Sequence, residues 1–298
     1  MRIAVLFSLL ILVITCDEPL AASVPANPAE STTTTAEVAA ASATASLDCG
    51  ASIAGVDPLL VPGTIVMLGE IHGTVEIPAF VGDLACQALA RGCRALLGLE
   101  YPALEQADLE AYLASDGGPA ARRALLAGAL WQAACPDGRS SQAIFDLVER
   151  ARALHQDGHR IDVFAFDPAT YHDWNRRDAG MAENILARAA ETPDALVLTL
   201  TGNLHNRLTR GLPWDENLVP AGVHVDAAHE HVISVDVRHA GGTAWIQCGP
   251  DQCGLADIAG KAVYGKRYVE LGEETSNDRG SGIFSVGTVS AAPPATVE

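Results

Sequence analysis

Short apolar runs alternate with longer amphipathic segments along the first two thirds of the chain. The runs are rich in Val, Leu, Ile and Phe, which is typical of buried strands, and they lie at 64–69, 95–99, 160–167 and 195–201. The segments around them repeat apolar positions at helical spacing, at 76–91, 103–115, 119–134, 140–157 and 176–191. This alternation predicts an α/β fold with a mainly parallel central sheet flanked by helices.

The last third of the chain has a different pattern. Strands are predicted at 232–237, 243–248 and 283–289, with glycine-rich connections and little helix. These strands either extend the parallel sheet or form an antiparallel flap, so the predicted fold is α/β with a strand-rich C-terminal region. Residues 291–298 are predicted to be a disordered tail.

The first 48 residues carry no pattern of a folded domain. Arg2 followed by the apolar stretch 3–14 is typical of a secretory signal and too short to span a membrane. We predict a signal peptide over 1–22 and a low-complexity flexible linker, rich in Ala, Ser, Thr and Pro, over 23–48. The alternative is a lipoprotein anchored through Cys16, which Thr15 disfavours because a small residue normally precedes the lipidated cysteine. Either way, an exported protein is expected, periplasmic or secreted.

Composition limits the size of the domain and the kind of partner. The chain has 298 residues, 49% of them hydrophobic, which suits one large α/β domain or at most two small ones; we assign one domain to 49–290. Its 37 Asp and Glu exceed its 19 Lys and Arg, for a formal charge of −18. Such an acidic chain has no field that attracts nucleic acid. A small-molecule or peptide-like ligand is expected instead, and no later segment is long and apolar enough for a transmembrane span.

The cysteines indicate disulfides. Besides Cys16 there are six, an even number that in an exported protein predicts disulfide bonds: Cys49, Cys86, Cys93, Cys135, Cys248 and Cys253. Cys248 and Cys253 flank a tight turn and are the favoured local bridge. Cys86 and Cys93 lie about 10 Å apart along one predicted helix, so each is expected to pair elsewhere, with Cys49 and Cys135 in either order. A cysteine metal site is disfavoured, because no Cys-X-X-Cys spacing occurs.

Ionisable residues follow the apolar runs at the points where the predicted strands end. The first run ends in Gly69-Glu70-Ile71-His72 and the fourth in Gly202-Asn203-Leu204-His205, while Glu100 and Asp167 close the second and third. The carboxyl ends of parallel strands share one edge of a sheet, where α/β proteins bind their ligands. One such strand end could belong to an ordinary surface loop, but four strand ends with ionisable residues predict a site.

The predicted helix at 176–191 adds a cation. Arg177 lies in its first turn, where the helix dipole disfavours positive charge, and Asp178 beside it offsets that cost. A residue placed against its local preference indicates another role, here with a substrate oxyanion or with Glu70. The alternative is a solvated Arg-Arg-Asp cluster on the surface.

Together these motifs resemble the Tiki/ChaN-like superfamily, which groups haem-uptake ChaN-like, TraB/Tiki and erythromycin esterase-like proteins. The resemblance covers roughly residues 60–294. It is carried by Leu68-Gly69-Glu70-Ile71-His72-Gly73, Glu100, the segment 177–185, Gly202-Asn203-Leu204-His205, and the segment 282–289 with Pro293-Pro294. It implies an α/β fold in which the motifs meet in one cleft. It further implies hydrolysis by the Glu and His residues in the enzymes of the group, and haem binding in the ChaN-like lipoproteins.

Two kinds of function are therefore expected. The first is a hydrolase in which His72 is the general base, tuned by Glu70 or Glu100, while His205 supplies acid or electrophilic help and Arg177 holds a developing negative charge. A variant of it binds a divalent metal ion through Glu70, His72 and His205, leaving an open position for water. The second is a non-catalytic protein that binds haem or another hydrophobic ligand, with His72 or His205 as the axial ligand. A serine hydrolase is disfavoured, because the only similar motif, Gly280-Ser281-Gly282, has the wrong spacing.

Overall fold

The structure is a computed structural model that describes residues 47–168, 172–212, 214–249, 252–261, 263, 267–272 and 280–296. The predicted signal peptide, and the predicted linker as far as residue 46, lie outside the described residues. None of the helices in this part of the chain combines the length and hydrophobicity that a membrane span requires.

The described strands form one mainly parallel sheet in the order β3-β2-β4-β1-β5-β8-β7, and β6 pairs with the far half of β5. Their bounds are β1 Ile65–Glu70, β2 Arg94–Pro102, β3 Ile161–Asp167, β4 Ala195–Gly202, β5 Val232–Gly249, β6 Gln252–Ile258, β7 Tyr268–Leu271 and β8 Gly282–Val289. Only β6 and β7 run antiparallel to their neighbours. The predicted α/β class with a parallel central sheet is confirmed, and the C-terminal strands both extend the sheet and add an antiparallel arm.

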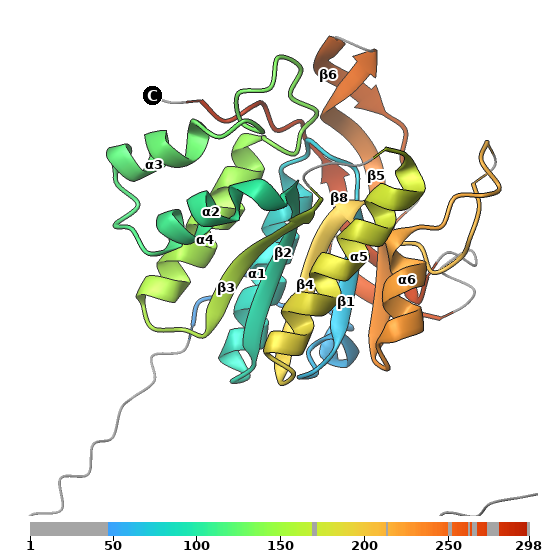
Figure 1. Ribbon diagram of the computed structural model, residues 1–298, viewed down its shortest axis with the longest axis horizontal. Helices are drawn as coiled ribbons and strands as arrows, with labels where there is room; N and C mark the ends of the chain where they lie inside the picture. The colour runs from blue at the N-terminus through green and yellow to red at the C-terminus, as the bar shows by residue number, and fades with distance from the viewer. Residues whose placement is uncertain are drawn as a thin grey trace, which may run out of the picture. The chain divides into compact units, whose positions relative to one another are not determined.

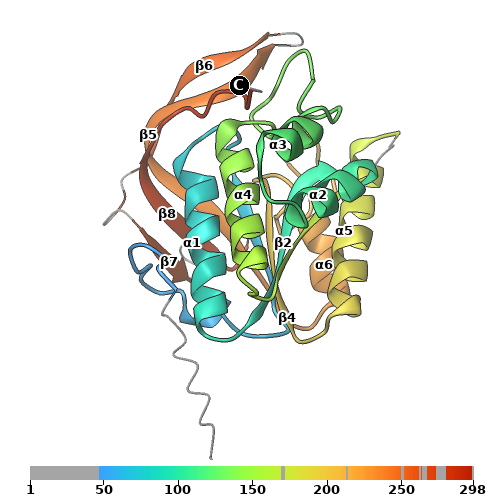
Figure 2. The ribbon, with the colours of Figure 1, turned by 90° about the vertical axis from the view of Figure 1, so that its left-hand side faces the viewer.

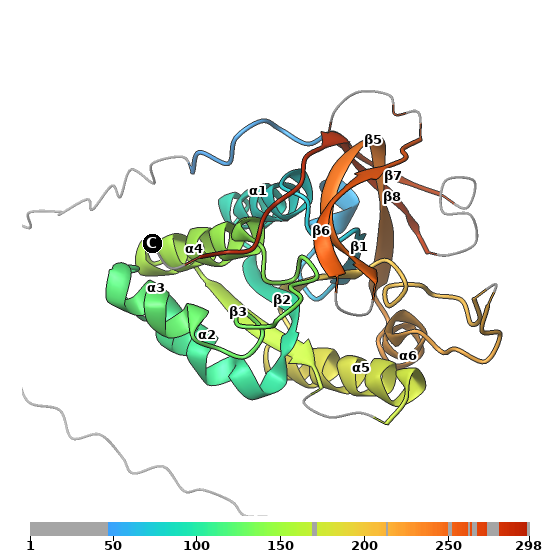
Figure 3. The same cartoon turned by 90° about the horizontal axis from the view of Figure 1, so that it is seen from above.

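Helices cover both faces of the sheet (Figures 1 and 3). Their bounds are α1 Glu76–Ala90, α2 Gln106–Leu113, α3 Pro119–Leu126, α4 Gln142–Gln156, α5 Trp174–Glu191 and α6 Ala221–Ala228, with short 3-10 turns at Asp57–Leu59 and Ala103–Glu105. Helices α1 and α4 lie on one face of the sheet, and α5 and α6 lie on the other.

Strand β1 shows why the predicted strands are apolar runs. Successive side chains of a strand point to opposite faces, so Val66 and Leu68 join the core under α1 and α4, while Ile65 and Met67 join the core under α5. All four side chains are fully buried. A strand covered by helices on both faces must be apolar at every position, which is the pattern of a central parallel strand.

Several elements differ from those predicted. The helix predicted at 119–134 ends at Leu126, and the strands predicted at 232–237 and 243–248 are one continuous strand, β5. The glycines between those two segments do not form a connection but an irregular stretch of β5, where the pairing with β8 shifts register near Gly242. Helix α6 and strands β6 and β7 were not predicted, because elements of eight, seven and four residues are too short to show a hydrophobic period.

Residues 290–296 run back over the domain, where the sequence predicted a disordered tail from residue 291. The amide of Ala292 donates to the Gly73 carbonyl at 2.9 Å, and the amide of Ala295 donates to the Ser140 carbonyl at 3.0 Å. Ala292 itself is buried. This segment therefore lies against the turn that follows β1 and against the start of α4; residues 297 and 298 lie outside the described residues.

Two disulfides join Cys49 to Cys86 and Cys135 to Cys253. The pairing of Cys86 with Cys49 agrees with one of the two predicted orders. The predicted Cys248–Cys253 bridge is wrong: the register of the β5–β6 hairpin places Gln247, not Cys248, opposite Cys253. The predicted bond to Cys93 is also wrong, because Cys93 precedes β2 at the amino-terminal edge of the sheet and its thiol is buried there without a disulfide.

Candidate functional site

The carboxyl-terminal ends of the central strands meet at one edge of the sheet. Glu70 at the end of β1 is in register with Gly202 at the end of β4, and β2 and β3 end beside them in the segments that carry Glu100 and Asp167. All five residues predicted for the site lie in this one place: Glu70, His72, Glu100, Arg177 and His205.

Glu70 and His72 form a hydrogen-bonded pair. The Nδ1 atom of His72 lies 2.8 Å from Oε1 of Glu70, whose side chain is almost fully buried. Because a carboxylate accepts, the Nδ1–H group donates, and this assigns the lone pair of the neutral ring to Nε2. In the described part of the chain Nε2 has no hydrogen-bond partner, and its nearest carboxylate oxygen, Glu100 Oε2, lies 3.6 Å away. About a fifth of the side chain (21%) is exposed, so Nε2 can meet a ligand.

Two glycines at the strand ends allow close packing around the site, Gly69 against Asn206 and Gly202 against His72. A Cβ atom on Gly69 would lie 2.4 Å from the side-chain oxygen of Asn206, so only glycine fits at that position of β1. A Cβ atom on Gly202 would lie 3.1 Å from Nε2 of His72 and 3.6 Å from Oε2 of Glu100. Gly202 therefore lies close against an imidazole and a carboxylate, and a side chain at residue 202 would crowd both.

Glu100 is buried and fully hydrogen-bonded. Its Oε2 atom accepts from the Thr201 hydroxyl and from the Gly202 amide, each at 2.8 Å, and its Oε1 accepts from Arg177 at 2.7 Å. Burial works to raise the pKa of this carboxyl, but the surrounding imidazoles and guanidinium groups outweigh it and hold the pKa well below its usual range. Glu100 is thus a fixed negative charge beside the His72 imidazole.

Arg177 lies beneath the site, in the first turn of α5. The helix begins two residues earlier than predicted, because Asp173 caps it by accepting from the Arg176 amide at 2.8 Å. The guanidinium of Arg177 donates to both oxygens of Asp167, at 2.9 and 2.6 Å, and to Glu100. Only 5% of the side chain is exposed. Arg177 therefore does not belong to a solvated Arg-Arg-Asp cluster on the surface, because it is buried among carboxylates.

His205 is held between an aspartate and an arginine. Its Nδ1 lies 2.8 Å from Asp178 Oδ1, and its Nε2 lies 3.1 Å from Arg177 Nη1. Because a guanidinium only donates, Nε2 accepts and Nδ1 carries the proton toward Asp178. The ring of Trp174 stacks on this imidazole with centroids 5.9 Å apart. Asp178 thus orients His205 rather than merely complementing the helix dipole.

The sequence reasoning missed Arg139 and Asp137, on the loop between α3 and α4. Arg139 is clamped on Asp137 by its Nε and Nη2 atoms, at 2.9 and 2.7 Å from Oδ2. Its Nη1 atom reaches Asp167 at 3.1 Å and Glu100 at 3.4 Å. The only local signal is the turn-forming Pro-Asp-Gly before Arg139, which predicts a turn but not where the turn lies.

Negative charge predominates in the site and affects His72. Five carboxylates, those of Glu70, Glu100, Asp137, Asp167 and Asp178, surround two guanidinium groups and two imidazoles. Burial works to lower the pKa of the His72 imidazole, but the charges of Glu100 and Glu70 and the hydrogen bond to Glu70 raise it above its ordinary value of about 6.5.

The arrangement does not suit the metal ion or the haem considered from the sequence. No three His, Cys, Asp or Glu side chains among the described residues converge as metal ligands. Glu70 Oε1 and His72 Nδ1 are hydrogen-bonded to each other, and an ion on His205 Nε2 would lie against the permanent positive charge of Arg177. Haem iron would need the same nitrogen, or His72 Nε2, which has Glu100 Oε2 3.6 Å away and Gly202 close beside it.

No protein-family model matches the chain, and no curated protein matches its sequence. Among solved structures, a mutant of the erythromycin esterase EreC in its open conformation is similar over 81% of this chain and 94% of its own, with a TM-score of 0.53. The chain has the fold of erythromycin esterase. The resemblance read from the motifs is confirmed at this level.

Two further structures share the erythromycin esterase fold with this chain. A protein from Bacillus cereus matches 83% of the chain and 95% of its own length with a TM-score of 0.55, and a succinoglycan biosynthesis protein matches 80% and 92% with a TM-score of 0.59. Sequence identity is 11% for both and 14% for the esterase. Such low identity establishes the fold alone, so the function has to come from the site.

Proposed function

We propose that this protein is an exported hydrolase that activates water with the His72–Glu70 pair, without a metal ion. The observation that carries the proposal is the geometry of His72: Nδ1 is fixed on a buried carboxylate, while the side chain is 21% exposed and its Nε2 has no hydrogen-bond partner among the described residues. A base oriented by a carboxylate in this way is the arrangement that general-base hydrolysis requires. The two disulfides in the domain are compatible with the export part of the proposal.

The proposed reaction is hydrolysis of an ester or amide. His72 Nε2 takes a proton from water as the water oxygen bonds to the carbonyl carbon, and the carbonyl electron pair moves to its oxygen. The resulting oxyanion then collapses, the bond to the leaving alcohol or amine breaks, and the imidazolium returns its proton to the leaving atom. Glu70 stabilises the imidazolium between the two proton transfers, as carboxylates next to catalytic histidines do.

The remaining residues are assigned positioning roles. Glu100 adds a second negative charge 3.6 Å from Nε2, which favours the imidazolium as it forms. Arg177 and Asp167 hold Glu100 in place, and His205 orients Arg177 through its Nε2. The sequence predicted acid or electrophilic help from His205; because its Nε2 accepts from Arg177, we propose an orienting role instead.

Trp174 indicates the kind of substrate. Its ring stacks on His205 and is 56% exposed, so it presents an apolar surface beside a negatively charged site. An aromatic ring of this kind packs well against an apolar or ring-shaped group. We propose a small or peptide-like substrate with an apolar part and no net negative charge.

The proposed function is tested by a screen of ester and amide substrates with and without a chelator. We expect hydrolysis that is unaffected by chelation, and we expect Gly202→Ala to abolish it because the new Cβ would lie 3.1 Å from Nε2 and crowd the atom that must meet the water. Gly202 does not have a positive φ, so alanine is tolerated by the backbone and circular dichroism should be unchanged. Activity that chelation abolishes and zinc restores would show a metallohydrolase instead, and activity retained in Gly202→Ala would place the chemistry elsewhere.

The pH dependence of the rate gives an independent test of His72. The base must be neutral, so kcat/KM should rise with pH, with a midpoint above about 6.5 because the folded-state pKa is raised. The same raised pKa stabilises the protein below the unfolded pKa and stops doing so as pH rises through the folded one. Glu70→Gln removes one of the raising charges, so the midpoint in this variant should move to lower pH. A midpoint that does not respond to Glu70→Gln would contradict the assignment.

A further inference from the structure

Arg177 and Arg139 share the same two carboxylates but differ in exposure. Nη2 of Arg177 and Nη1 of Arg139 both donate to Glu100 Oε1 and to Asp167 Oδ2. Arg177 makes the shorter contacts, at 2.7 and 2.6 Å, and is 5% exposed; Arg139 makes contacts of 3.4 and 3.1 Å and is 23% exposed. Arg177 is therefore buried and closely hydrogen-bonded to both carboxylates, whereas the guanidinium of Arg139 lies on the side nearer to solvent.

The Arg139 side chain is held rigidly by its own loop. Asp137 accepts from both Nε and Nη2, which fixes the plane of the guanidinium. Asp137 in turn has its pKa lowered: burial works to raise it, but the hydrogen bonds and charge of Arg139 prevail. Among the described residues Nη2 donates one hydrogen, to Asp137, which leaves its second for a ligand, while Nη1 makes contacts of 3.1 and 3.4 Å to Asp167 and Glu100.

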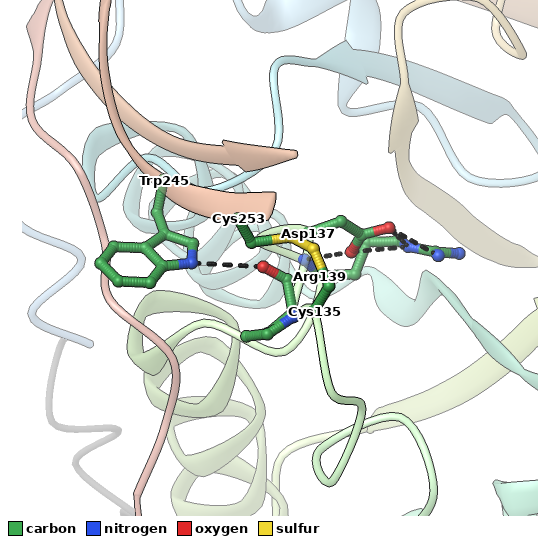
Figure 4. The surroundings of a disulfide bond; sticks show 6 residues. Cys135, Asp137, Arg139, Trp245 and Cys253 are labelled. Carbon is green, nitrogen blue, oxygen red and sulfur yellow. Dashed lines mark hydrogen bonds and ion pairs between the residues drawn. A yellow bond between two sulfur atoms is a disulfide. The ribbon is translucent and has the colours of Figure 1, made fainter. Parts of the chain in front are cut away.

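The loop itself is fastened to the β5–β6 arm (Figure 4). Cys135 is bonded to Cys253 on β6, and the Trp245 indole of β5 donates to the Pro136 carbonyl at 3.2 Å. Figure 2 shows the arm and the loop side by side above the ends of the central strands. Between α3 and α4, residues 127–141 form no helix and no named strand, so these ties determine where the loop lies.

The fastened loop touches the turn that carries His72. Gly138 has a φ of +95°, and a Cβ atom there would lie 2.3 Å from the Gly73 amide nitrogen and 2.8 Å from the His72 carbonyl carbon. The backbones of the two segments are therefore in direct contact. Since residue 138 precedes Arg139, the position of the disulfide-linked loop sets the position of Arg139 relative to His72.

We propose that Arg139 binds the oxyanion formed in the His72 reaction, and that the Cys135–Cys253 disulfide is a functional part of the site because it holds Arg139 there. The proposal rests on the proposed hydrolase function and assigns to Arg139 the role that sequence reasoning gave to Arg177. As water adds to the carbonyl carbon, the carbonyl oxygen becomes negative and accepts hydrogen bonds from the guanidinium. No bond to Arg139 forms or breaks.

The test compares Arg139 with a surface arginine. Arg139→Gln should lower kcat for p-nitrophenyl butyrate by about 10²–10³-fold with little change in KM, since it removes a contact made only in the transition state. Arg139→Lys should recover part of this loss, because lysine restores the positive charge but not the planar guanidinium with its paired donors. Arg123→Gln, on the exposed face of α3, is the matched control and should leave kcat unchanged. Equal kcat in Arg139→Gln and the control would overturn the proposal.

Two further readouts separate this role from a structural one. The charge of Arg139 opposes protonation of His72, so Arg139→Gln should shift the acid limb of the pH–rate profile to higher pH. Calorimetric titration with p-nitrophenyl methylphosphonate, an anion resembling the oxyanion, should show binding to the wild-type protein and loss of it in Arg139→Gln. Binding without hydrolysis would overturn the hydrolase function while retaining Arg139 as the anion-binding group; unchanged binding in Arg139→Gln would overturn the role of Arg139.

The disulfide has its own matched control in the same chain. Cys135→Ser/Cys253→Ser should lower kcat by about 10–100-fold, the effect expected of a misplaced catalytic group. Cys49→Ser/Cys86→Ser removes a disulfide that fastens the start of the domain to α1, and it should leave kcat unchanged at a temperature where both variants are folded. If the two double variants have the same kcat, the Cys135–Cys253 bond has no part in the site.

Discussion

Replacing His72 by asparagine should abolish turnover while leaving the fold intact. The asparagine amide nitrogen occupies about the place of Nδ1, so it can still donate to Glu70, but nothing replaces Nε2. Loss of a general base typically lowers kcat by about 10²–10⁴-fold. Because the side chain is partly exposed and its hydrogen bond is retained, the free energy of unfolding should change by less than about 1 kcal/mol. Steady-state kinetics and urea unfolding measure the two quantities.

Two companion variants make this result specific. His155→Asn changes a histidine on α4 that bonds the Ile161 carbonyl away from the site, and it should keep full activity. His72→Gln keeps a polar group near Nε2 but loses the contact with Glu70, so it should be both inactive and less stable than His72→Asn. Substantial kcat in His72→Asn would remove His72 from the mechanism, whatever the other variants do.

Replacing Arg177 by methionine should give the largest loss of stability of any single change in the site. Methionine has a similar length and no charge, so Glu100 and Asp167 lose their shortest ion pairs in a buried setting. Breaking a buried ion pair by removing one partner typically costs about 3–5 kcal/mol. For a domain of this size, this corresponds to a fall of roughly 6 to 20 °C in thermal midpoint. Urea and thermal unfolding at neutral pH measure the loss.

The pH dependence of that loss has a defined sign. In the wild-type protein the pKa of Glu100 is depressed, so its contribution to stability is present above the unfolded pKa and disappears as pH falls through the folded one. Without Arg177 the folded pKa of Glu100 rises, so the stability difference between variant and wild type should narrow as pH falls through the pKa of Glu100 in the variant. Arg176→Met, on an arginine that is 72% exposed, is the control and should cost less than about 0.5 kcal/mol. Equal losses in the two variants would mean that the Arg177 ion pairs do not stabilise the fold.

The parts of the fold that could be predicted from the sequence are those that local patterns determine. Strands β1 to β4 are buried on both faces, so each is a mostly apolar run followed by a polar residue near the edge of the sheet. Parallel pairing then brings these ends together without further information. Glu70, His72, Glu100 and His205 were found in this way. Arg177 was singled out because the helix dipole disfavours a positive charge in the first turn of a helix.

Arg139 could not be predicted, because contacts distant in the sequence decide its place. No hydrophobic period marks the loop, and its position depends on a disulfide to Cys253 and on the packing of Gly138 against Gly73. The prediction of the Cys248–Cys253 disulfide was wrong for the same reason. Spacing favoured Cys248 with Cys253, but the hairpin register and the approach of a distant loop decided the outcome. The glycines of β5 were predicted to connect two strands, whereas they form an irregular stretch within one strand.

The turn after His72 has a consequence for the order of folding. The Gly73 carbonyl accepts from the amides of both Trp245 and Ala292, and Gly138 packs on the same turn. As the chain folds, most of the parallel sheet can pair before residue 292 is in place, but this turn cannot be completed until then. Contacts so distant in sequence form late, because their loop-closure entropy must be met first. A folding chain can therefore bury much of its core before the turn that follows His72, the histidine that we assign to catalysis, has formed its contacts.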